Sequence, residues 1–173
     1  MIRKDALKVR FLTNFYLIAR LDSRTHPMLN GFEGLALALC VSFLAVIIHY
    51  ESLRLISMTS IEKRGYHRTR ILMVILGVIA AHLVEAGVYA VGFWLGVEFL
   101  GLGRFAGSPP ENAFQYYYFA LETYTTQSVG DLYPVGGLRI LAAIEPLVGL
   151  ILISWSASLT FVAMRRYWRR GSD

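Results

Sequence analysis

The sequence has almost no cysteine, and two of its three longest apolar segments lack lysine and arginine. Cys40 is the only cysteine, so an intrachain disulfide is impossible and a site built from several cysteine ligands is excluded. Lysine and arginine are absent from residues 32–53 and 71–100. No apolar segment holds the arginine repeat of a voltage-sensing helix. The net charge of +5 comes from basic residues outside the apolar segments, which is typical of membrane anchors and argues against a nucleic-acid partner.

Long apolar segments are what the sequence does have. Of its 173 residues 55% are hydrophobic, and the mean hydropathy is +0.50. A helix crosses a bilayer with about 20 apolar residues. Residues 32–53, 71–100 and 138–164 meet that length. The sequence therefore predicts an all-α, multi-pass membrane protein with three transmembrane helices.

The segments outside these spans are basic or rich in turns. Residues 1–31 mix basic and apolar side chains, which predicts an amphipathic helix in the membrane interface, although a flexible basic leader is the alternative. We expect residues 54–70 to form a basic cytoplasmic linker and residues 166–173 a basic cytoplasmic tail. Residues 101–111 predict a turn-rich loop, because Pro109-Pro110 excludes a helix there.

One apolar segment is too short to cross a membrane. Residues 112–125 predict a helix of about half the required length, and residues 126–130 follow as a polar stretch. Irregular polar backbone at membrane depth is tolerated only where it is buried in protein or lines water. The order of span, half-length helix, polar stretch and span indicates a re-entrant pore loop. The carbonyl end of such a helix favours a cation.

Two short motifs in this loop resemble a known family. They are Ala120-Leu121-Glu122-Thr123-Tyr124-Thr125-Thr126 and Gly130-Asp131-Leu132-Tyr133-Pro134. They are similar to the pore loop of tetrameric potassium channels, especially small bacterial KcsA-like ones. The resemblance covers residues 71–165 as a pore domain, with outer helix 71–100, pore helix 112–125, filter 126–130 and inner helix 138–164. The span at 32–53 would be an additional N-terminal helix.

The resemblance implies a role for each matching position. The permeating cations would meet Thr126, Gln127, Ser128, Val129 and Gly130, with Thr126 forming the innermost site. Glu122 would hydrogen-bond Asp131 behind the filter, and Tyr118 and Phe119 fall where the family has an aromatic cuff. The family filter reads Thr-Val-Gly-Tyr-Gly, so this one departs from it at three positions. A side chain at position 128 costs roughly 1 kcal/mol where the family glycine has positive φ.

These departures leave several functions open. We expect a preference for cations to persist, because the helix dipole, the carbonyls and Asp131 remain. Selectivity for potassium over other cations is not implied by the altered filter residues. The alternatives are a non-selective or divalent-permeable channel and a non-conducting sensor or membrane partner. A membrane enzyme or metal protein built on His49, His82 and Glu85 is a further alternative. The expected depths, with His49 near the cytoplasmic end and His82 near the middle, argue against it.

Other polar residues lie inside the predicted spans. His82 and Glu85 form an i, i+3 pair, which we interpret as an interhelix contact, a proton sensor or, least favoured, a metal site. Ser154, Ser156 and Ser158 fall at a similar depth on the third span. Glu145 is expected level with the filter, where it either buttresses the loop or joins Glu122 and Asp131 in a pH-sensitive carboxylate network.

Three residues of the third span are candidates for gating. Pro146 and Gly149 weaken this helix, either as a gating hinge or as a packing kink. Phe161 is either a hydrophobic constriction or an ordinary lipid-facing side chain. Since one loop cannot enclose a pore, the resemblance implies a homotetramer. We expect passive permeation in a bacterial inner (plasma) membrane, with lipid as partner, no enzymatic activity, and no cofactor beyond permeant monovalent cations such as K⁺.

Overall fold

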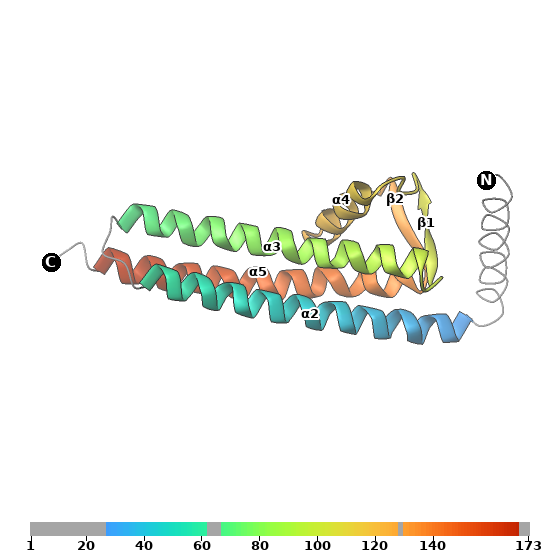
Figure 1. Ribbon diagram of the computed structural model, residues 1–173, viewed down its shortest axis with the longest axis horizontal. Helices are drawn as coiled ribbons and strands as arrows, with labels where there is room; N and C mark the ends of the chain where they lie inside the picture. The colour runs from blue at the N-terminus through green and yellow to red at the C-terminus, as the bar shows by residue number, and fades with distance from the viewer. Residues whose placement is uncertain (1–26, 62–66, 128–129, 170–173) are drawn as a thin grey trace, which may run out of the picture.

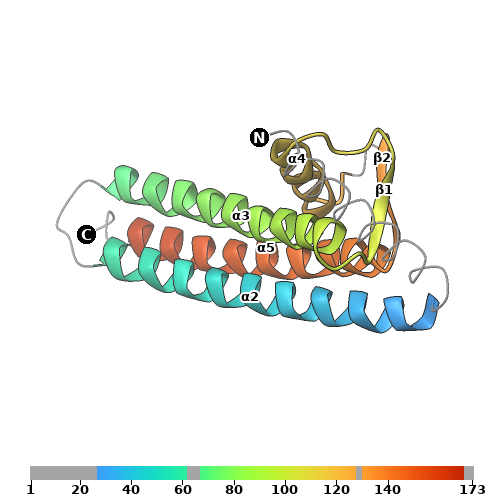
Figure 2. The same ribbon diagram turned by 45° about the vertical axis from the view of Figure 1, so that its right-hand side comes forward.

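Three long helices lie side by side and form the body of the molecule (Figure 1). The computed structural model describes residues 27–61, 67–127 and 130–169. The long helices are α2 (Pro27–Ile61), α3 (His67–Glu98) and α5 (Leu138–Arg169). α3 runs antiparallel to the other two, as the second view also shows (Figure 2).

Each long helix contains a segment that is long and apolar enough to cross a membrane. These segments are Gly31–Met58, Thr69–Glu98 and Leu138–Arg165. At 1.5 Å per residue they extend about 42–45 Å, beyond the roughly 30 Å of a hydrocarbon core. Large apolar side chains such as Phe43 and Leu76 point outward, with 69% and 64% of their surface exposed. The prediction of three spanning helices is confirmed at this level.

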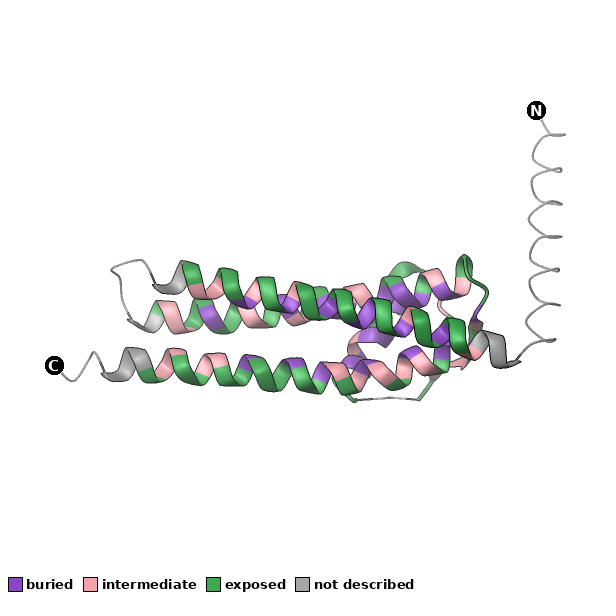
Figure 3. Cartoon of the chain, turned by 90° about the horizontal axis from the view of Figure 1, so that it is seen from below, coloured by how far each residue is buried: buried purple, intermediate pink, exposed green. Residues whose placement is uncertain are grey.

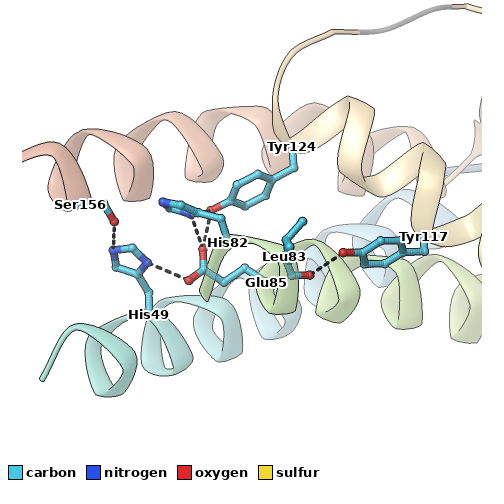
Figure 4. A network of polar contacts seen from close by, with 7 residues as sticks. All are labelled: His49, His82, Leu83, Glu85, Tyr117, Tyr124 and Ser156. Atoms are coloured by element: carbon cyan, nitrogen blue, oxygen red, sulfur yellow. Dashed lines mark hydrogen bonds and ion pairs between the residues drawn. The ribbon is translucent and has the colours of Figure 1, made fainter. Parts of the chain in front are cut away.

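A short helix and a small sheet complete the fold at one end of the bundle (Figure 1). α4 (Ala113–Tyr124) is capped at its N-terminus by Asn112, whose side chain accepts a hydrogen bond from the Gln115 backbone N–H (3.1 Å). This cap satisfies one of the free N–H groups of the first turn. α4 leaves the end of the bundle and its C-terminus reaches the middle of α3 and α5 (Figures 1 and 4).

The two short strands were not predicted. β1 (Gly103–Gly107) and β2 (Leu132–Gly136) pair antiparallel, with Gly103 opposite Gly136 and Gly107 opposite Leu132. The predicted loop at 101–111 is therefore partly a strand. Gly107 has φ +89, and a Cβ there would collide with the Asp131 carbonyl, so glycine permits the close pairing. The sheet therefore pairs the two ends of the segment 103–136, which contains α4.

An aromatic cluster holds α4 and β1 against α3. The Phe119 ring of α4 meets Phe93 of α3 and Phe105 of β1, with centroids 5.0 and 4.9 Å apart. Tyr116 packs edge-on against Phe105 at 5.7 Å. Such edge-to-face pairs contribute about 0.5–1.5 kcal/mol each beyond the area that they bury. Figure 3 shows buried residues on the facing sides of the helices and around α4.

The helices differ from the expected ranges mainly at their ends. The helix expected at 32–53 extends to Ile61. Of the basic linker expected at 54–70, residues 54–61 and 67–70 are helical, and residues 62–66 lie outside the described residues. α5 continues to Arg169, into the expected tail. Hydropathy marks where a helix is apolar and not where its hydrogen bonds end, so polar ends were underestimated. The interfacial helix expected at 1–31 falls outside the described residues up to position 26.

Candidate functional site

The polar stretch after α4 begins with a hydrogen-bonded helix cap. The Gln127 N–H donates to the Glu122 carbonyl (2.8 Å), and the Thr126 N–H donates to the Thr123 carbonyl (3.0 Å). This pair of bonds is a Schellman motif, which ends a helix with one residue in the left-handed conformation. The motif turns the chain away from the axis of α4 at Thr126. The side chains of Thr126 and Gln127 are exposed.

Thr126 occupies a conformation that usually belongs to glycine. Its φ is +63, and for a β-branched residue the left-handed region costs about 1–2 kcal/mol. Sequence reasoning placed the strain at Ser128, which lies with Val129 outside the described residues. Gly130 also has positive φ, at +86. Strain of this kind persists where the surroundings impose it, and it concentrates at functional sites.

The end of α4 is fixed against α5 by a close backbone approach. A Cβ on Gly149 would lie 2.5 Å from the carbonyl oxygen of Tyr124 and 3.3 Å from its ring. Only glycine lets the two helices come this close. α5 remains one helix through Pro146. Gly149 thus has a packing role in this conformation, and its role as a gating hinge stays a prediction.

A buried polar network joins α2, α3, α4 and α5, the four helices of the described residues (Figure 4). Its members are His49 of α2, His82 and Glu85 of α3, Tyr124 of α4 and Ser156 of α5. One carboxylate oxygen of Glu85 lies 2.8 Å from His49 Nδ1. The other lies 3.0 Å from His82 Nδ1 and accepts a hydrogen bond from the Tyr124 hydroxyl (2.5 Å). His49 Nε2 lies 3.4 Å from the Ser156 hydroxyl.

The hydrogen bonds of the network compensate for the cost of burying the Glu85 carboxylate midway along the helices. Glu85 and His49 are fully buried, whereas the His82 side chain is 18% exposed. Removing a charged group from water is costly unless hydrogen bonds compensate. Three donors from three different helices surround the Glu85 carboxylate. His82 and Glu85 do make an interhelix contact, but it joins α3 to α2 and α4. The expected link to the third span is made by His49, through Ser156.

The expectation that His49 and His82 lie at different depths was wrong. Their ring centroids are 5.3 Å apart. The error came from ending the first helix at residue 53, whereas α2 continues to Ile61. His49 therefore lies about 18 Å before the end of α2, and His82 about 22 Å after the start of the antiparallel α3. The two depths agree, and the argument against a site shared by both histidines fails.

Sequence reasoning missed Tyr124 as a member of the network and only partly located Ser156. Tyr124 was assigned to the pore helix, with nothing to indicate which way its hydroxyl points. Of the three serines on α5, Ser154 and Ser158 donate to carbonyls of their own helix at 2.7 and 3.2 Å. Ser156 alone of these three contacts α2. The i, i+3 spacing of His82 and Glu85 was the signal that located the network.

Glu122 and Asp131, on either side of the polar stretch after α4, are less connected than the resemblance implied. In the described part of the chain, no hydrogen bond joins Glu122 to Asp131, and one oxygen of buried Glu122 has no partner. The Tyr118 phenol is exposed beside Glu122, whose hydrogen bond and negative charge raise the pKa of Tyr118. Phe119, the second residue expected in a cuff, belongs to the aromatic cluster of its own chain.

Glu145 is a buried carboxylate without hydrogen-bond partners. It is fully buried on α5, and among the described residues neither of its oxygens is paired. It lies within electrostatic range of Tyr89 and Tyr124. No hydrogen bond within the described ranges links it to Glu122 or Asp131. The pH-sensitive carboxylate network expected for Glu122, Asp131 and Glu145 stays a prediction.

Replacing Glu145 with leucine is expected to raise the free energy of unfolding by about 1–3 kcal/mol. This is the usual cost of a buried polar group left without a partner. Denaturant unfolding of the purified protein in detergent measures the change. As a matched control, Glu98→Leu, at the exposed end of α3, should change stability by less than about 0.5 kcal/mol. A loss of stability in Glu145→Leu would contradict the prediction.

Phe161, the candidate constriction, points away from the body of the single chain. It is 60% exposed, and the Arg165 guanidinium lies 6.0 Å from its ring centroid. Whether Phe161 narrows a pore stays a prediction.

A second hydrogen bond attaches α4 to α3. The Tyr117 hydroxyl of α4 donates to the Leu83 carbonyl of α3 (3.1 Å; Figure 4). α4 is thus bonded to the middle of α3 by both Tyr117 and Tyr124.

Fold and site together define the class of protein. It is a predominantly helical protein with three helices able to span a membrane, a half-length helix ending among them, and a buried polar network at that end. Compared with known proteins, the chain matches no family model, no curated protein and no solved structure. Its function is therefore argued from the residues and their geometry.

Proposed function

We propose that four copies of this chain form a cation channel in a bacterial inner membrane. The observation that carries the proposal is the placement of the polar stretch after α4. α4 has 12 residues, about 18 Å of helix, and it ends beside the middle of α3. There the chain turns at Thr126 and exposes the side chains of residues 125–127. In a membrane, such backbone requires water or protein around it.

The charge distribution favours a cation at this position. The carbonyl end of α4 carries the negative end of the helix dipole. Asp131 is exposed just beyond the stretch. Apart from Arg139 near the start of α5, the membrane-crossing parts of the three long helices contain no lysine or arginine between Gly31 and Leu53, Ile71 and Glu98, or Leu138 and Met164. A ring of such loops, one from each subunit, would surround a permeation path with oxygen ligands.

The fourfold assembly and the filter roles rest on the potassium-channel resemblance of residues 120–134. A single loop encloses nothing, so a closed symmetric ring is required. Thr126, Gln127 and Gly130 are the proposed filter positions within the described residues, and Ser128 and Val129 complete the set. Tyr124 and Gly149 would hold the filter in place from behind, because they fix the end of α4 to α3 and α5.

Ion flux through the purified chain in liposomes tests this function. We expect the wild type to pass the monovalent cations K⁺ and Na⁺ with little preference between them. The variant Ser128→Gly with Val129→Tyr restores the family residues and should raise the preference for K⁺. The same substitutions on α2, Ser52→Gly with Val46→Tyr, form the matched control and should leave selectivity unchanged.

Each outcome of the flux assay has a defined meaning. Absence of flux for K⁺, Na⁺ and Ba²⁺ in both the wild type and the filter variant would refute the channel, and it would favour a non-conducting sensor or membrane partner. Strong permeation by Ba²⁺ in the wild type would identify a divalent-permeable pore. Selectivity that responds equally to the α2 control would show that the filter is elsewhere.

A further inference from the structure

The network around Glu85 has the composition of a metal site as well as of a hydrogen-bonded contact. We propose that His49, His82 and Glu85 bind a divalent transition-metal ion, with Zn²⁺ as the best-suited ion. The three residues come from two antiparallel helices, α2 and α3, and meet about midway along both. Metal binding would be a property additional to ion permeation, and it does not depend on the channel proposal.

The ligand atoms are close to the spacing that zinc requires. One nitrogen from each histidine and one oxygen of Glu85 all lie within 4.8 Å of one another. Ligands held about 2.0–2.1 Å from a tetrahedral zinc are about 3.3 Å apart. Glu85 contacts His49 through one carboxylate oxygen at 2.8 Å and His82 through the other at 3.0 Å. The three ligand atoms would have to draw together around the ion by at most about 1.5 Å, the difference between 4.8 Å and 3.3 Å. Small side-chain rotations would therefore suffice to admit the ion.

The proton count leaves room for a cation. His82 Nδ1, the second Glu85 oxygen and the Tyr124 hydroxyl are mutually close, at 3.0, 2.9 and 2.5 Å. The Nδ1 atom and the phenol carry at most one proton each, so at most two protons serve these three contacts. His82 must then share one proton between two acceptors. A metal ion in place of the histidine proton would satisfy the imidazole and the carboxylate together.

Outer-shell contacts and access fit the same interpretation. A metal-binding histidine usually hydrogen-bonds through its second nitrogen, which fixes the ring. The Ser156 hydroxyl lies 3.4 Å from His49 Nε2 and is placed to do this. The Trp155 ring covers His49, with centroids 5.4 Å apart. His82 is the only one of the three ligands with an exposed part, 18% of its side chain, whereas the other two are fully buried.

The ligand types select the class of ion. Two imidazoles and one carboxylate match the three protein ligands of many zinc sites, which leave a fourth position open. The Tyr124 hydroxyl or a water molecule could occupy that position. Mg²⁺ and Ca²⁺ prefer oxygen ligands and should not compete. Because histidine ligands must be deprotonated, zinc binding should weaken as the pH falls.

Zinc retention by the full chain tests the proposal. The protein is purified in detergent, dialysed against Zn²⁺ and analysed for metal per chain by mass spectrometry. We expect about one zinc per chain, unaffected by excess Mg²⁺ or Ca²⁺. His82→Ala should weaken binding at least about tenfold, since even the loss of an outer-shell partner has an effect of this size. Glu85 keeps two other partners in this variant.

A second histidine of α3 provides the matched control. His67 lies about 22 Å along α3 from His82, so His67→Ala should bind zinc like the wild type. If His82→Ala fails to fold, His82→Gln replaces it, because it keeps a polar side chain. The proposal is overturned if the wild type retains no zinc, or if the folded His82 variant retains as much as the wild type. Flux without zinc, or zinc without flux, separates this proposal from the channel.

Discussion

Replacing Glu85 with alanine is expected to lower the free energy of unfolding by about 3–5 kcal/mol. Removing one partner from a buried, charged network leaves the remaining polar groups unpaired, and this range is typical of that change. Here His49, His82 and Tyr124 all lose the carboxylate that they surround. Thermal or denaturant unfolding of the purified protein, in detergent and without added metal, measures the loss.

An exposed ion pair on α2 provides the control for Glu85. Glu51 and Arg54 lie 3.2 Å apart, with side chains 56% and 57% exposed. Exposed pairs contribute little because water already solvates both charges. Glu51→Ala should therefore cost less than about 1 kcal/mol. If the Glu85 and Glu51 variants lost similar amounts, the network would not be the stabilising contact that its geometry indicates.

Replacing Gly149 with valine is expected to lower the free energy of unfolding by about 2–3 kcal/mol. The new side chain would meet the Tyr124 carbonyl, a backbone group that cannot rotate away, and overpacking of this kind commonly costs 1–3 kcal/mol. The same substitution displaces the end of α4 and thus Thr126, two residues later. If the channel proposal holds, the variant should also lose cation flux. Unfolding and liposome flux are measured on the same preparation.

A second helical glycine separates crowding from other effects. A Cβ on Gly87 of α3 would lie 3.6 Å from the Tyr117 ring, an ordinary contact distance. Gly87→Ala should therefore gain up to about 1 kcal/mol from the better helix propensity of alanine. Gly149→Ala should instead lose stability, since its Cβ lies 2.5 Å from a backbone oxygen. Equal effects of alanine at the two positions would contradict the close-packing account.

Periodicity and hydropathy located the helices but not the sheet. The three spans and α4 follow from apolar length, and Pro109-Pro110 correctly excluded a helix before α4. β1 and β2 are only five residues each, and their partner lies far along the chain. Pairing of such short strands depends on where α4 returns the chain, which no local pattern encodes. The two glycines of β1, and the proline and glycine of β2, suggested turns instead.

The site shows the same division between local and distant information. The i, i+3 spacing of His82 and Glu85 was visible in the sequence because both residues lie on one helix. The contact with His49 depends on where α2 ends relative to α3, and an error of eight residues in that end moved His49 by about 12 Å. The strain at Thr126 depends on how α4 is capped, which the motif alone did not reveal.

The sequence by itself determined that three helices are long and apolar enough to cross a membrane and that a half-length helix with a polar stretch lies between the second and the third. These features depend on residues close together in the chain. Only the tertiary structure decided that His49, Glu85, Tyr124 and Ser156 meet, and that the end of α4 packs directly against Gly149. Those contacts require the register of separate helices, which packing of the whole chain sets and no local pattern contains.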